Sequence, residues 1–188
     1  MPGETNTTIG STRPLDERDG DPAASLDARG DLAGSGHMRI AADGTWYHEG
    51  RPIPRKRLVQ LFATILRRED DGGYWLKTPV EQVRVTVDDV PFVAQELDRH
   101  GTGRDQVLAL RTNLDDWVEA GPDHPIWVRE DPETGTPRPY IRIKDGLDAL
   151  IARSVFHELA ALAEPSGEET LGVWSHGTFF PLGPATAD

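Results

Sequence analysis

The sequence contains no cysteine among its 188 residues, which excludes disulfide bonds and any chemistry that needs a thiolate. A chain without cysteine suits a reducing compartment, so we expect a cytoplasmic protein. No apolar run approaches the roughly 18 residues of a membrane-spanning helix, and the N-terminus lacks a charged start followed by an apolar segment. The sequence therefore predicts neither a membrane span nor a signal peptide.

Basic charge is also scarce. The chain has 20 Lys and Arg against 32 Asp and Glu, which gives a formal net charge of −12 and an isoelectric point of about 4.9. Proteins that bind duplex DNA need clustered cations to neutralise its phosphates. The composition therefore argues against an extended DNA duplex as a partner.

Several catalytic motifs are missing. The sequence has no phosphate-binding loop of the Walker type and no Gly-x-Ser-x-Gly segment. Gly101 and Gly103 are followed by Arg-Asp-Gln, so they do not form a dinucleotide-binding turn that opens a helix. The zinc-protease pattern that begins at His157 fails because position 161 is Ala161. We therefore expect no cofactor and no catalytic residue, and we favour a protein that is not an enzyme.

The composition divides the chain into two tails and two units. Residues 1–37 have almost no large apolar side chains and are predicted to form a disordered tail. Residues 38–103 and 104–183 each contain predicted strands and one long amphipathic helix, and residues 184–188 form a short C-terminal tail. The first tail accounts for part of the low mean hydropathy of −0.51, and the remainder can bury an ordinary core.

The first unit is organised around a helix that begins near Pro54 and is expected to end at Gly72 and Gly73. Its apolar side chains recur at three- and four-residue spacing, at Leu58, Leu61, Phe62, Ile65 and Leu66. Strands are predicted at residues 39–41, 45–48, 51–53, 74–77, 82–87 and 91–97. Pro91 predicts that the last of these strands lies at a sheet edge.

The second unit has the opposite order of elements. Strands are predicted at residues 106–111, 126–129 and 140–143, followed by a helix over residues 147–164 and a hairpin of residues 171–176 and 178–182. The helix has an apolar stripe of Leu147, Leu150, Ile151, Val155, Phe156, Leu159 and Leu162. The Trp-containing segment 44–50 is echoed by segment 172–177. We interpret the two halves as related α+β units, each with one helix covering one sheet.

Cations and an aromatic side chain lie near several predicted strand ends. A rigid turn displays Lys77 and Thr78, because the following proline biases Thr78 to an extended backbone. A pocket between the units could combine Lys77, Arg142 and Arg153 for an anion. Tyr140 would then stack on a base. Ordinary packing and hydrogen bonding between the units is an equally weighted interpretation.

Two carboxylate pairs, Asp88-Asp89 and Asp115-Asp116, would support acid–base or magnesium chemistry if they converged in one pocket. Adjacent carboxylates in turns are more often solvated, and we favour that interpretation. A metal-assisted hydrolase is therefore the least favoured alternative, and no metal ligand is predicted.

Seven segments of the chain follow one another in a recognisable order. They are Asp-Gly-x-Trp (43–46), Gly-x-Pro-Ile-x-Arg (50–55), Leu-Val-x-Leu-Phe-x-x-Ile-Leu (58–66), Tyr-x-Leu-x-Thr-Pro-Val-Glu (74–81), Val-Asp-Asp-x-Pro-Phe (87–92), Thr-Asn (112–113) and Pro-Tyr-Ile (139–141). Together they resemble a bacterial family of uncharacterised proteins, domain of unknown function 1285. The resemblance covers residues 38–182, and Thr-Pro-Val-Glu and Val-Asp-Asp-x-Pro-Phe are its most specific segments.

The resemblance implies a duplicated α+β core whose C-terminal half is superficially similar to pleckstrin-homology folds. It also implies a nucleotide or nucleic-acid-derived ligand, bound between the two halves in a signalling context, and no catalytic residues. Carried over by position, the ligand-binding candidates are Lys77, Thr78, Glu81, Thr112, Asn113, Tyr140 and Arg142.

The first hypothesis is therefore a non-catalytic cytoplasmic module that binds a small anionic, nucleotide-like ligand between its two units. The second hypothesis is a protein-interaction adaptor, because pleckstrin-like sheets often add a peptide strand at an exposed edge. Pro91 and the loop after Arg129 are expected to leave such an edge free.

Overall fold

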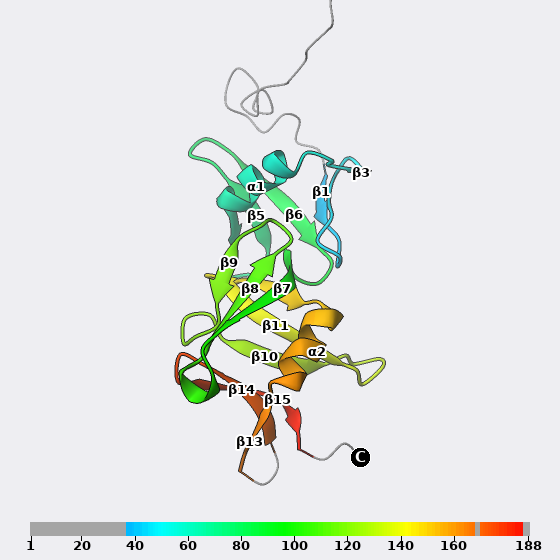
Figure 1. Cartoon of the computed structure of the whole chain (residues 1–188). Coiled ribbons are helices and arrows are strands. Elements are labelled where there is room, and N and C mark those ends of the chain that lie inside the picture. Colours follow the sequence, from blue (N-terminus) through cyan, green and yellow to red (C-terminus); the bar gives the residue numbers. More distant parts are fainter. Residues whose placement is uncertain (1–36, 168–169, 186–188) are drawn as a thin grey trace, which may run out of the picture.

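The computed structural model describes residues 37–167 and 170–185, which form three β-sheets and two α-helices. Figure 1 shows the first sheet at the top, the second in the middle and a small third sheet at the bottom. The predicted N-terminal tail lies outside the described residues, apart from His37. No helix among the described residues is long and apolar enough to cross a membrane.

The first sheet joins two antiparallel three-stranded meanders through one parallel pair, β1 with β6. Its strand order is β3-β2-β1-β6-β5-β4, and α1 connects β3 to β4. The elements are β1 (Met38–Ile40), β2 (Trp46–His48), β3 (Arg51–Pro52), α1 (Lys56–Ile65), β4 (Leu66–Arg68), β5 (Tyr74–Lys77) and β6 (Gln82–Val87).

The second sheet has the strand order β10-β11-β12-β7-β8-β9, and its parallel pair is β12 with β7. The elements are β7 (Phe92–His100), the short 3-10 helix η2 (Gly103–Asp105), β8 (Val107–Thr112), β9 (Trp117–Glu119), β10 (Ile126–Glu130), β11 (Pro137–Lys144) and β12 (Leu147–Ile151). It is followed by α2 (Arg153–Ala161) and by the third sheet, β13 (Glu164–Ser166), β14 (Thr170–Ser175) and β15 (Thr178–Pro184).

The two large sheets repeat one topology. In each, the first and sixth strands of the unit pair in parallel at the centre, and an antiparallel meander extends to either side. The helices differ in position, since α1 follows the third strand of its unit whereas α2 follows the sixth. The α+β architecture with two related helix-on-sheet units is therefore confirmed.

The hairpin echo is not the basis of that repeat. The β2–β3 turn at Glu49 and Gly50 has φ values of 51° and 73°, and the β14–β15 turn at His176 and Gly177 has 48° and 70°. Both turns match the type I′ geometry that favours two-residue hairpins. However, β14 and β15 belong to the third sheet, so the two hairpins do not occupy equivalent places.

The first helix is shorter than predicted. It ends at Ile65, and Leu66 pairs with Leu76 as part of β4. Lys144 Nζ of the second unit donates a hydrogen bond to the Ala63 carbonyl at 2.8 Å and caps the last turn. Gly72, which was expected to end the helix, has a φ of 79° and instead turns the chain between β4 and β5.

The second helix was predicted to start six residues too early. Residues 147–151 form β12, which pairs with β7 through Ala149↔Phe92 and Ile151↔Ala94, and the helix spans Arg153–Ala161. Leu147, Ala149 and Ile151 are buried, and β12 lies between two other strands. The periodicity of a short run of buried apolar residues does not distinguish a strand from a helix. The sequence pattern therefore predicted this run as part of the helix that follows.

The strand after Pro91 is central rather than at an edge. β7 begins at Phe92 and lies between β12 and β8, so Pro91 precedes the first paired residue and removes no ladder bond. Strand pairing also assigns β7 to the second sheet, although residues 92–100 fell within the first unit of the sequence-based division.

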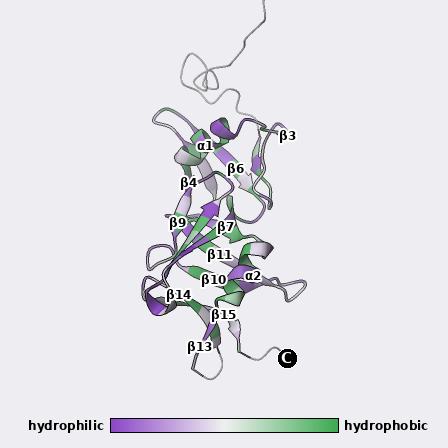
Figure 2. Ribbon diagram, in the orientation of Figure 1, coloured by the Kyte–Doolittle hydropathy of each residue, from purple (hydrophilic) through white to green (hydrophobic). Residues whose placement is uncertain are grey.

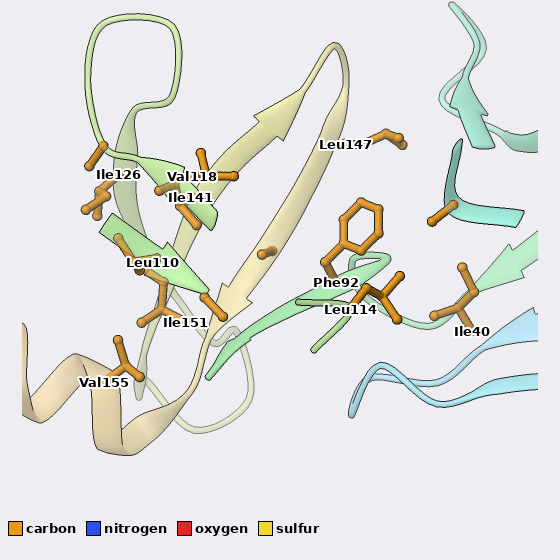
Figure 3. Packing of buried hydrophobic residues seen from close by; sticks show 14 of the residues in the cluster. Ile40, Phe92, Leu110, Leu114, Val118, Ile126, Ile141, Leu147, Ile151 and Val155 are labelled. Atoms are coloured by element: carbon orange, nitrogen blue, oxygen red, sulfur yellow. The ribbon is translucent and has the colours of Figure 1, made fainter. Parts of the chain in front are cut away.

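One continuous apolar core joins the two units. The cluster runs from Ile40 and Phe62 in the first unit through Phe92 and Leu114 to Ile151 in the second. Figure 3 shows Phe92 and Leu114 between the strands of the second sheet and Ile40. Hydrophobic colouring gathers along strands of the second sheet in Figure 2. The buried side chains of the two units therefore form one cluster.

Asn113 adds polar bonds to this junction. Its Oδ1 accepts a hydrogen bond from the Val93 amide at 3.1 Å, and its Nδ2 donates to the Gly44 carbonyl of the first unit at 3.2 Å. A Cβ at Gly44 would lie 2.6 Å from Asn113 Nδ2. The junction therefore requires a residue without a side chain at position 44.

We predict that Gly44→Ala destabilises the chain more than Gly50→Ala in urea unfolding. Both positions have positive φ, so each alanine pays roughly 1–2 kcal/mol for the left-handed backbone. A Cβ at Gly50 meets nothing within 4 Å, whereas at Gly44 it displaces Asn113, at a further cost of about 1–3 kcal/mol. Equal losses for the two variants would contradict this account of the junction.

Candidate functional site

Alternating residues of two paired strands gather arginines and aromatic rings on one face of the second sheet. Trp127 lies opposite Tyr140, and Arg129 lies opposite Arg138, in the register of β10 with β11. Since side chains of a strand alternate between its faces, Arg142 projects on the same side. We call this set, Trp127, Arg129, Arg138, Tyr140 and Arg142, the arginine–aromatic face.

The rings and guanidinium groups of this face are stacked. Trp127 and Tyr140 have centroids 5.8 Å apart and planes inclined by 20°. The guanidinium carbon of Arg129 lies 5.6 Å from the Tyr140 centroid and 5.9 Å from that of Trp127. Arg142 lies 5.7 Å from the Trp127 centroid. These separations are within the range of cation–π attraction.

Carboxylates hold most of the face in place. Asp89, in the segment between the two sheets, accepts from Arg138 at 2.6 Å and from the Tyr140 hydroxyl at 3.1 Å. Asp131 accepts from Arg138 at 3.4 Å, and Asp148 forms an ion pair with Arg142. These bonds fix two of the three arginines and the tyrosine.

Arg129 differs from the other two arginines. Among the described residues it forms no ion pair with a carboxylate, and its interactions are with Trp127 and Tyr140. The indole N–H of Trp127 is buried and has no hydrogen-bond acceptor within the described part of the chain. Among the described residues, the face therefore contains a cation without a carboxylate partner, Arg129, and a hydrogen-bond donor without an acceptor, Trp127 Nε1.

The first unit meets the β11–β12 turn, which follows the strand of Tyr140 and Arg142, through Arg68 of β4. Arg68 lies 5.4 Å from the centroid of Tyr74. Burial raises the pKa of Tyr74, Arg68 opposes that rise, and the charges of Asp148 and Arg129 also act on the ring. A Cβ at Gly146, in the β11–β12 turn, would lie 3.0 Å from Arg68 Cβ. The face and these two side chains therefore lie at the meeting of the units.

Protonation states within the face are well defined. Burial raises the pKa of Tyr140, although the hydrogen bond from Arg138 opposes that shift. The pKa of Arg138 is raised chiefly by its bond to Tyr140, with Asp89 adding to the effect. Near neutral pH the face therefore holds a neutral tyrosine beside permanently charged guanidinium groups.

Two predicted site residues, Tyr140 and Arg142, belong to the arginine–aromatic face. Two others, Thr112 and Asn113, lie at the β8–β9 turn. The Thr112 hydroxyl is buried and accepts the amides of Leu114 and Asp116 at 3.2 and 3.3 Å, so it shapes that turn. Asn113 bonds the two units, as described above.

The structure does not bring Lys77, Thr78 and Glu81 to the face. They lie at the β5–β6 turn, the opposite end of β5 from Tyr74, roughly 10 Å further along a strand. Lys77 pairs with Glu69, and the Thr78 hydroxyl accepts the Glu81 amide at 3.0 Å. Arg153 also lies elsewhere, on α2, where its Nε lies 3.4 Å from His157 Nε2.

Three of the four aspartates of the hydrolase alternative have separate cationic partners, and the fourth, Asp116, forms hydrogen bonds through its backbone. Asp88 pairs with Arg39, Asp89 with Arg138, and Asp115 with Lys56. The Asp116 carbonyl and amide are used in the turn at Thr112. Across the described residues, no group of three or more His, Asp or Glu side chains could hold a metal ion.

Sequence reasoning missed five members of this region: Arg68, Tyr74, Trp127, Arg129 and Arg138. The signal for three of them was present in the sequence. Trp-x-Arg at 127–129 and Arg-x-Tyr-x-Arg at 138–142 have the two-residue period of a strand face. Arg68 could not be found that way, because its segment was assigned to a helix.

We predict that Asp89→Asn lowers the free energy of unfolding by about 1.5–3 kcal/mol, since hydrogen bonds to charged groups contribute that much. Asp88→Asn is the matched control, and it should cost less because its partner Arg39 is an exposed cation. Chemical denaturation of both variants measures the difference. A larger loss for Asp88→Asn would show that Asp89 does not anchor the face.

Comparison with known proteins identifies the family. Residues 29–90 match the model described as "Domain of unknown function (DUF1285), N-terminal domain". Residues 91–182 match "Protein of unknown function (DUF1285), C-terminal domain". The comparison with curated proteins gives no match.

Two crystal structures are similar to the chain. A DUF1285 family protein from Silicibacter pomeroyi DSS-3 shares 47% identity with a TM-score of 0.75, covering 79% of this chain and 80% of that one. A DUF1285 family protein from Shewanella baltica OS155 shares 26% identity with a TM-score of 0.51, covering 65% of this chain and 89% of that one. With these matches over both units, the chain belongs to the DUF1285 family.

Proposed function

We propose that the protein is a non-catalytic module that binds a small, planar, anionic ligand of the nucleotide type at the arginine–aromatic face. The observation that carries this proposal is Arg129, a cation stacked on Trp127 and Tyr140 with no carboxylate partner among the described residues. A bound anion would supply the missing counter-charge.

The chemistry of the face suits such a ligand. A guanidinium group presents paired N–H donors that match a phosphate or carboxylate. Trp127 is half-buried and would offer a stacking surface to a base, which stacks on any π-face, whereas Tyr140 is buried and would support Trp127 from behind. The buried indole N–H of Trp127 adds a donor without a partner among the described residues. Arg68 and Tyr74 would contact the ligand from the first unit.

Binding rather than catalysis is favoured by the state of the carboxylates. Asp89, Asp131 and Asp148 each accept a bond from an arginine of the face. A carboxylate that already accepts a bond from a guanidinium group cannot take a proton from a substrate without breaking that bond. We also propose a signalling role, as the family resemblance implies, and a cytoplasmic location, which the absence of cysteine favours.

We predict that Arg129→Ala raises the dissociation constant for the tightest-binding nucleotide about ten- to a hundredfold, the loss expected for charge-assisted bonds. Isothermal titration of the full chain with ATP, GTP, AMP and cyclic dinucleotides measures it. Arg84→Ala is the matched control, since Arg84 stacks on Trp75 at 5.8 Å outside the face.

Lys77→Ala should also leave the dissociation constant unchanged, because Lys77 lies at the far end of β5 and pairs with Glu69. Equal dissociation constants for the parent chain and Arg129→Ala would refute the site. The absence of binding by every nucleotide in the series would refute the ligand class.

A further inference from the structure

The second unit has a short turn at the place in the chain where the first unit has a helix. In the first unit the chain passes from the third strand to the fourth through α1. The equivalent connection in the second unit, from β9 to β10, is a tight turn in which Gly121 and His124 exchange backbone bonds at 3.2 and 3.1 Å. In Figure 1, β9 lies at the side of the second sheet. No helix therefore lies in the β9–β10 connection, and β9 is an edge strand of its sheet.

The backbone of β9 offers hydrogen-bonding groups along this edge. Thr112 N bonds to Asp116 O at 2.8 Å, and Ala120 N bonds to Leu108 O at 2.8 Å. Because antiparallel bonds recur at every second residue, Val118 faces β8 between these positions. The main-chain N–H and C=O groups of Trp117 and Glu119 therefore point away from β8. Within the described sheet, β9 has no other neighbour.

A groove runs along the same edge. One hollow of about 350 Å³ and another of about 490 Å³ share Val118 and Ile143 as lining residues. Gln60 and Thr64 of α1 close one end, and His124 lines the other. The groove thus has apolar residues at its base and lies beside the outer side of β9, which pairs with no strand of the described sheet.

Trp117 lies beside the groove and is 50% exposed. Among the described residues, the other exposed large apolar side chains are Leu61 and Val80. The opposite edge strand of the sheet, β10, packs beside β15. The β9 edge is therefore the more accessible of the two.

The groove carries more negative than positive charge. Its acidic lining residues are Asp116, Glu119 and Asp123, and one lysine, Lys144, also lines it. Lys144 donates to the Ala63 carbonyl at 2.8 Å, and burial lowers its pKa. Glu119 lies 2.8 Å from His176 Nε2, so its charge is offset only when that histidine is protonated. A basic segment complements this lining.

We propose that β9 accepts an extended, basic peptide segment of a partner protein as an added strand. The main chain of the segment would bond to the outward groups of Trp117 and Glu119. Alternate apolar side chains would rest on Val118 and Ile143 while the basic ones meet the carboxylates. Since β9 is 3 residues long, a segment of about three to four residues spans this edge.

The test uses two capped hexapeptides, Lys-Val-Lys-Val-Lys-Val and Glu-Val-Glu-Val-Glu-Val, titrated into the nitrogen-15-labelled full chain. We expect the basic peptide to bind at least tenfold more tightly than the acidic one. It should also slow hydrogen exchange at the Trp117 and Glu119 amides. Failure of the basic peptide to bind, or protection of amides elsewhere than β9, would overturn the proposal.

Two variants separate backbone pairing from side-chain packing. Trp117→Pro removes the outward N–H at an edge position, where proline is tolerated, and should weaken the basic peptide at least tenfold. Trp117→Ala keeps that N–H, so it should weaken binding of the basic peptide less than Trp117→Pro does. An unchanged dissociation constant in folded Trp117→Pro would overturn the added-strand geometry.

A third variant tests the charge without touching the backbone. Glu119→Lys should weaken the basic peptide and strengthen the acidic one, and equal affinities would contradict the proposed chemistry. Arg129→Ala, in the arginine–aromatic face, should leave peptide affinity unchanged. A loss in Arg129→Ala matching that in Trp117→Pro would overturn the separation of the two sites.

Discussion

The structure depends on the apolar contact between its two units. Phe92 and Leu114 of the second unit lie in the same buried cluster as Ile40 and Phe62 of the first (Figure 3). Burial of these apolar side chains in one shared cluster favours the joined arrangement of the units. This contact places Arg68 and Tyr74 beside the arginine–aromatic face, and it brings Gln60 and Thr64 of α1 to the end of the β9 groove. Both proposed sites are therefore consequences of the same packing.

Repetition of one topology with a displaced helix gives the two units different surfaces. Each unit has its parallel pair at the centre and two meanders that curl away from it. In the first unit α1 connects the two meanders. Its residue Phe62 stacks on Trp46 in the core of that unit, with ring centroids 6.2 Å apart. In the second unit α2 follows the sixth strand instead, and β9 is an edge strand joined to β10 by a short turn. The sheet edge proposed from sequence for a partner was wrong at Pro91, because β7 is central.

Local signals in the sequence predicted local structure well. The turn at Glu49 and Gly50 and the strands with alternating burial were predicted, because both depend on residues close in the chain. The boundaries of both helices were wrong where a strand adjoins a helix, since Leu66 and Leu147 are apolar in either state. Tyr140 and Arg142 were placed in the candidate site, but their neighbour Arg129 was not. Its role appears only once the register of β10 on β11 is known, and register between distant strands is not encoded by local propensity.

We expect the two sheets to unfold as one cooperative body because they share a core. Native-state hydrogen exchange tests it most directly, by comparing the slowest amides of β6 with those of β12. The account predicts that both sets open with the same free energy and the same dependence on urea, because neither sheet keeps its buried face without the other. If one set opened at a lower free energy while the other stayed protected, the units would be independent domains, and the shared origin of the two sites would be contradicted.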